Sequence, residues 1–132
     1  MSADTTTNEA AVSVRKGPLV GPVLGRVVGM LAARAQCPID RLDDAMLLTD
    51  AVAAHAPAHT TDAHVQVVVA ADDAGLELRI GALSRDGARS LLEDAELPGV
   101  GNVFKRVADE VDARASGEGP GELVLRLRFA SS

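Results

Sequence analysis

Apolar and polar residues alternate one by one in several stretches of this chain, a period that is typical of strands with one buried face. The clearest stretch covers residues 122–129, where leucines fall on one side and two arginines on the other. Residues 65–69 and 76–80 alternate in the same way around a short turn, which predicts a β-hairpin with Gly75 available for a positive φ angle. Residues 11–15 predict a short edge strand. The residues expected beneath the helices are Val65, Val67, Leu78, Ile80, Leu123, Leu125 and Leu127.

Elsewhere the apolar residues recur at steps of three and four, which indicates amphipathic helices. The first helix is expected over residues 18–36. The second begins at Asp40, a good N-cap, and ends at Pro57, which lacks the N–H needed to continue. A third is expected to open at residues 97–101 and to reach Val111. Two further segments are a short helix or mobile loop over residues 88–95 and a strand over residues 112–116.

Strands with one apolar and one solvated face belong to antiparallel or mixed sheets that helices cover on one side only. The predicted fold class is therefore α+β: a two-layer α/β sandwich with a mixed, mostly antiparallel sheet and helices on one face. Residues 1–10 are polar, rich in threonine and without apolar periodicity, which predicts a disordered tail. Residues 11–130 are expected to form a single domain, since 132 residues can bury a core of useful size.

Composition narrows the classes of partner. The chain is 47% hydrophobic but has no Trp, no Tyr and two Phe, so its core is aliphatic. A net charge of −6 argues against nucleic acid, because phosphate binding needs clustered Lys and Arg. No apolar run approaches the ~20 residues of a membrane span, and no signal peptide is visible. Cys37 is the single cysteine, so no internal disulfide forms, and a cytoplasmic protein is expected.

Three segments carry a resemblance to a known family. Residues 38–51 and 98–111 resemble the second and third helices of the small bacterial anti-sigma factors, and residues 119–127 resemble their last strand. These proteins act as serine kinases in partner-switching pathways and share the Bergerat ATPase fold with histidine kinases. The resemblance covers about residues 12–130. It implies a histidine-kinase-like fold, a homodimer, and a sigma factor or an anti-sigma antagonist as the partner.

The chemistry of that family needs a carboxylate on the second helix and a magnesium-binding Asn one turn later. The alignment places Ala51 and His55 at these positions. Alanine cannot take a proton, and magnesium prefers oxygen ligands. A shift of the alignment by one residue recovers Asp50 but places Ala54 where the Asn belongs. Either alignment loses one of the two groups.

The nucleotide-binding turns of the family are also incomplete. Residues 80–84 have no acid to recognise adenine, and the Asp86-Gly87 pair comes several residues late. Gly99 and Gly101 keep a Gly-x-Gly pattern whose backbone amides could meet a phosphate, although such glycines also close loops tightly against a sheet. If ATP–Mg²⁺ binds, Gly99 and Gly101 should contact it. We expect this binding to be weak or absent, with no catalytic residue and no metal ligand.

The histidines and serines suggest no further chemistry. His55, His59 and His64 do not have the spacing of a metal site, and solvated loop histidines are the favoured interpretation. No Ser/His/Asp arrangement of a hydrolase is apparent.

Three functions fit these observations. The favoured one is a regulatory protein-binding domain that keeps the kinase fold but has weakened or lost ATP chemistry. The others are an active ATP-dependent anti-sigma serine/threonine kinase and a structural subunit. The expected partner surface is the stripe Asp44, Leu48 and His55 of the second helix, with the neighbouring segment 84–98. The alternative is that the stripe packs beneath this segment as core.

Overall fold

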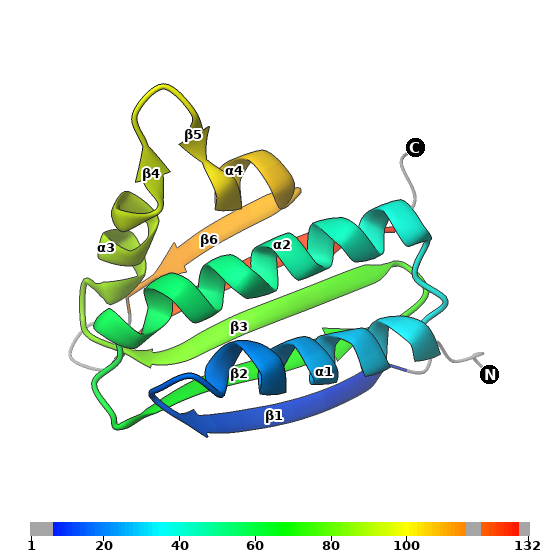
Figure 1. Cartoon of the computed structure of the whole chain (residues 1–132), viewed down its shortest axis with the longest axis horizontal. Helices are drawn as coiled ribbons and strands as arrows, with labels where there is room; N and C mark the ends of the chain where they lie inside the picture. The colour runs from blue at the N-terminus through cyan, green and yellow to red at the C-terminus, as the bar shows by residue number, and fades with distance from the viewer. Residues whose placement is uncertain (1–6, 116–119, 130–132) are drawn as a thin grey trace.

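Five strands form one antiparallel sheet that helices cover on a single face (Figure 1). The structure is a computed structural model, and it describes residues 7–115 and 120–129. Every strand pair in the five-stranded sheet is antiparallel, in the order β1-β2-β3-β7-β6. The two-layer α+β prediction is confirmed. The strands are β1 (Asn8–Arg15), β2 (His64–Ala71), β3 (Gly75–Leu83), β6 (Glu110–Arg114) and β7 (Gly121–Arg128).

Two long helices, α1 (Val20–Arg34) and α2 (Ile39–His55), lie side by side on the sheet (Figure 1). Two glycines of α1 face α2: a Cβ built at Gly21 would make ordinary contact with Ala53 at 3.6 Å, and one at Gly25 with Met46 at 3.4 Å. A single 3₁₀ turn, η1 (Ala56–Ala58), follows α2. The helix begins at Ile39, so Asp40 lies in its first turn and the expectation that it is the N-cap is wrong.

The core lies between this helical layer and the sheet. All seven residues that the sequence placed beneath the helices are buried. Arg126 and Arg128 lie on the opposite face of β7, as the alternation predicted. Gly75 does not have the expected positive φ. A Cβ at this position would lie 2.4 Å from the carbonyl oxygen of Leu127, so the residue must be glycine because β7 passes so close.

The segment between β3 and β6 differs most from the predictions. Helix α3 (Gly87–Asp94) is formed, and it leads into a small hairpin of β4 (Glu96–Leu97) and β5 (Gly101–Asn102). Helix α4 (Val103–Val107) has five residues and ends well before the predicted Val111, which lies in β6. The chain is extended at Ala108 because the Asp109 carboxylate accepts a hydrogen bond from the Arg128 N–H at 2.6 Å.

Two strands also begin at other residues than the sequence predicted. β1 begins at Asn8, so residues 8–10 belong to the sheet and not to the expected tail, of which residues 1–6 lie outside the described part. The strand expected over residues 112–116 is β6, which begins two residues earlier. None of the helices in the described ranges has the length and apolarity that crossing a membrane requires.

Candidate functional site

The α2 stripe that was expected to be a surface faces α4 and the core. Leu48 is 1% exposed and Ala51 is buried. His55 is half-buried, and its ring meets the fully buried ring of Phe104 edge-on, with centroids 6.5 Å apart. The expectation that Leu48 is exposed is wrong, because α4 packs on this side of α2. The stripe is therefore core along most of its length, which is the alternative that the sequence left open.

Asp44, at the other end of the stripe, belongs to an ion-pair cluster centred on Arg41. The Arg41 guanidinium donates from Nη1 to the Asp44 carboxylate at 2.8 Å and from Nη2 to the Asp109 carboxylate at 2.7 Å. Its Nε donates to the carbonyl oxygen of Arg128 at 2.8 Å. Partial burial lowers the pKa of Arg41, but the hydrogen bond and charge of Asp44 and the charge of Asp109 outweigh it and raise the pKa overall. The cluster thus ties α2 to the end of β7 and the start of β6.

The fold shows where each of the two alignments of α2 would place its key residue. Asp50 is exposed on the outward side of the helix, whereas Ala51 points into the molecule. An alignment that relies on Asp50 therefore places the carboxylate in solvent, away from α4. An alignment that relies on Ala51 places a methyl group inside. In neither case does position 50 or 51 bring a carboxylate to the buried side of α2.

Gly99 and Gly101 have positive φ angles of 79° and 98° and both lie in the β4–β5 hairpin. Pro98 and Gly99 are the central residues of a turn that the Val100 N–H closes on the Leu97 carbonyl at 3.0 Å. Proline followed by glycine at φ near +80° is the signature of a type II turn. The backbone geometry therefore accounts for Gly99 without a phosphate.

Asn102 is the N-cap of α4, a role that the sequence analysis did not predict. Its side-chain oxygen accepts hydrogen bonds from the N–H groups of Phe104 at 3.0 Å and Lys105 at 3.4 Å. Its side-chain NH₂ donates to the carbonyl oxygen of Leu92 at 2.6 Å. The available signal was an Asn directly before the apolar-periodic residues, since Asn is among the preferred N-cap residues. Two backbone amides at the start of α4 are thus engaged within the chain.

The segment 84–98 is held against the body of the protein. Leu91 and Ala95 belong to the core, and His59 contacts the carboxylate of Asp94, which links η1 to α3. Asp86, the late candidate for adenine recognition, is exposed just before α3. The described ranges contain no group of three or more His, Cys, Asp or Glu side chains arranged to hold a metal ion.

A solved protein shares this fold. A chain in the crystal structure of the SiaB–SiaC complex from Pseudomonas aeruginosa matches with a TM-score of 0.59 and 14% sequence identity, over 90% of this chain and 89% of that chain. At this identity the likeness to the SiaB–SiaC chain concerns the fold alone. No protein-family model and no curated protein matches the sequence.

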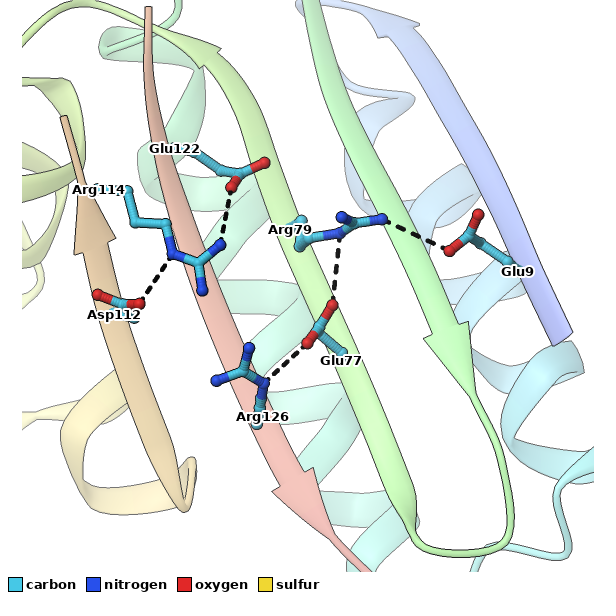
Figure 2. A network of polar contacts seen from close by, with 7 residues as sticks. All are labelled: Glu9, Glu77, Arg79, Asp112, Arg114, Glu122 and Arg126. Carbon is cyan, nitrogen blue, oxygen red and sulfur yellow. Dashed lines mark hydrogen bonds and ion pairs between the residues drawn. The ribbon is translucent and has the colours of Figure 1, made fainter. Parts of the chain in front are cut away.

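The sheet face opposite the helices carries an ordered network of charges (Figure 2). Glu77 lies between two arginines, with its carboxylate 2.8 Å from Nε of Arg126 and 3.4 Å from Nε of Arg79. Arg79 reaches across β2 to Glu9 of β1 at 3.5 Å. A shallow depression of about 450 Å³ near the β2–β3 turn borders the network. Because these charges largely neutralise one another, the face is suited to contact with water.

Arg114 forms the second half of this network, with Asp112 at 2.8 Å and Glu122 at 3.6 Å (Figure 2). Val124 lies among these side chains on the same face and is buried. Their aliphatic stems thus cover apolar surface while the charged groups reach water.

Large apolar side chains of the described residues are exposed at the starts of the two long helices, at Leu19 and Ile39, and at two further places that the sequence analysis did not identify. On the outward side of the helical layer, Met30 of α1 is 52% exposed and Leu47 of α2 is 50% exposed. At the β4–β5 hairpin, Leu97 is 53% exposed and Val100 is 58% exposed. Periodicity alone assigned the wrong side of α2 to the surface, because the position of α4 was unknown.

Proposed function

We propose that this chain is a regulatory protein-binding domain of the anti-sigma type in which ATP chemistry is weakened or lost. The observation that carries the proposal is the burial of Phe104 against His55, on the side of α2 that borders the nucleotide in the resembling family. Two apolar residues of α2, Leu48 and Ala51, complete this filled region. Phe104, Leu48 and Ala51 offer no oxygen ligand to magnesium and no polar side chain to ATP.

Further support comes from Asn102, whose side chain already engages two backbone amides at the start of α4, next to the Gly99–Gly101 turn. The fold likeness to a chain of the SiaB–SiaC complex adds a solved example of this fold in a protein–protein assembly. A sigma factor or an anti-sigma antagonist is the partner that the family resemblance implies. It also implies a homodimer, which sedimentation velocity would test, while the single Cys37 favours a cytoplasmic setting.

The test is a pull-down with the purified chain from native cytoplasm, in the presence and absence of ATP–Mg²⁺, followed by identification of the captured proteins. A sigma factor or a sigma-factor antagonist captured equally in both conditions is the expected result. Capture that requires nucleotide, or transfer of the γ-phosphate to a serine of the captured protein, would contradict the proposal and favour the active kinase. Titration calorimetry with ATP–Mg²⁺ should show no micromolar binding.

A further inference from the structure

We propose that the β4–β5 hairpin and α4 form a docking site for a segment of a partner protein that carries a bulky apolar side chain next to a carboxylate. The inference rests on the proposed function and adds the place and the chemistry of recognition. It moves the contact surface away from the α2 stripe, which is core, to the hairpin that projects from the body of the molecule (Figure 1).

The apolar part of the site is a concavity of about 300 Å³ between the hairpin and the helix. Leu97 pairs with Gly101 across the hairpin, and the stem of Arg106 lies over this glycine, where a Cβ would be 3.4 Å from its Cδ. The volume is at the lower end of the range for ligand sites, which suits one bulky side chain. The residues that line it are Leu97, Val100, Gly101, Val103, Arg106 and Val107.

Hydrogen bonds hold the site in one arrangement before any partner arrives. Arg106 Nη1 donates to the Val100 carbonyl at 2.7 Å, which fixes the turn against α4. Asn102 bonds the Leu92 carbonyl and so fixes the base of the hairpin to α3. A backbone that hydrogen bonds already hold needs less ordering when a partner binds, which favours an interface anchor.

The charge next to the concavity selects a carboxylate. Arg106 lines the concavity, is exposed, and among the described residues has no carboxylate partner. The N–H groups of Arg106 that are not bonded to Val100 can donate to an incoming carboxylate. The net charge of −6 does not prevent this, because charges beyond a Debye length of ~8 Å are screened at physiological salt.

The probe is a phage-displayed library of random dodecapeptides, panned against the full chain. We expect enrichment of peptides in which a Leu, Met or Phe is adjacent to Asp or Glu.

The affinities of the enriched peptides are then measured by fluorescence anisotropy with labelled synthetic peptides. The double variant Leu97→Ser/Val100→Ser should weaken binding at least tenfold. The matched control Met30→Ser/Leu47→Ser, which removes equally exposed apolar side chains from the helical layer, should change it less than twofold.

Arg106→Glu provides a second readout. Panning against this variant should replace the acidic residue of the enriched peptides with Lys or Arg, whereas Arg106→Lys should keep the acidic preference. A loss of hairpin order alone would weaken binding without reversing the charge preference. Circular dichroism of each variant verifies that it is folded.

Several results would overturn the inference. These are the absence of enriched peptides, undiminished binding to the hairpin double variant, and loss of binding to the control variant. A dimer of the chain that sedimentation detects and that Leu97→Ser/Val100→Ser dissociates would assign the surface to a second copy instead. If peptide binding depends on Met30 and Leu47, this site is refuted but the proposed function is not. Nucleotide-dependent capture or phosphate transfer would refute the function itself.

Discussion

At the scale of single residues, glycines that look alike in the sequence have different roles in the fold. Gly99 supplies the positive φ of a turn, whereas Gly75 provides room for the backbone of a neighbouring strand. The sequence predicted the wrong role for Gly75 because a turn preference is local, while the approach of β7 depends on pairing with residues far along the chain. Substitution of glycine is therefore expected to change the free energy of unfolding by different amounts at different positions.

Gly75→Ala should lower the free energy of unfolding by about 1–3 kcal/mol, since the added methyl group meets the Leu127 carbonyl and β7 must shift. The matched control is Gly29→Ala in α1, where a Cβ has no neighbour within 4 Å. That variant should be up to ~1 kcal/mol more stable, because alanine favours a helix. Urea unfolding followed by circular dichroism measures both. Equal stability of the two variants would refute the close approach.

Burial raises the pKa of the Cys37 thiol, an effect that the charge of Arg41 opposes. Because the thiolate is the reactive form, alkylation by iodoacetamide should be slow at neutral pH. The rate should reach its half-maximal value at a higher pH in the folded chain than in the same chain unfolded in urea. Identical pH profiles in the two states would contradict the effect of burial.

At the scale of elements, sequence periodicity could not tell correctly which side of α2 is buried and which is exposed. Leu47 and Leu48 are adjacent in the sequence and about 100° apart around the helix, which places one in solvent and one in the core. The choice of face depends on α4, whose five residues were predicted as a longer helix. That helix is short because Asp109 bonds to Arg128, a contact that no local pattern reveals.

Leu48→Ala should cost about 2–5 kcal/mol as a core cavity, whereas Leu47→Ala should change stability by no more than ~0.5 kcal/mol. The pair is matched, since both replace a leucine in the same turn of the same helix. Thermal unfolding of the two variants gives the comparison. A small effect of Leu48→Ala would restore the stripe as a candidate surface.

The Arg41 cluster joins three elements and should be a measurable source of stability. Arg41→Met keeps most of the aliphatic stem but removes the donors to Asp44, Asp109 and the Arg128 carbonyl. We expect a loss of about 1–3 kcal/mol, typical of hydrogen bonds to charged groups. Arg26→Met, at an exposed position of α1, should have little effect in the same urea titration. Similar losses for both variants would show that the cluster contributes nothing specific.

Sequence patterns predicted the strands and the long helices well but the candidate site poorly. Alternation in β7 determines which residues are buried, because a shift of one residue would bury Arg126. The region around α3 and α4 has no such constraint. There the fold depends on Asn102, which bonds back to Leu92, and on Phe104, which fills the space beside α2.

At the scale of the whole molecule, the position of each strand in the sheet should determine its protection from hydrogen exchange. β3 is central and lies between β2 and β7, whereas β1 and β6 are the edges of the described sheet. We expect the amides of Leu78 and Ile80 to exchange most slowly and those of β1 to exchange much faster. Equal protection of β1 would indicate that another chain covers this edge, as the homodimer expectation implies.

The strand order also has a kinetic consequence. β2 and β3 are joined by a short turn, and β6 and β7 are consecutive strands, so each pair has mostly local contacts. The sheet is complete only when β1 pairs with β2 and when these two hairpins join along β3 and β7, both across long stretches of chain. The β3–β7 pairing is the one that joins the two hairpins. Closing so long a loop is slow, so the transition state for folding should contain the β3–β7 seam. Conservative substitutions at Leu78 and Leu125 should therefore slow refolding more than substitutions in β1, in stopped-flow experiments.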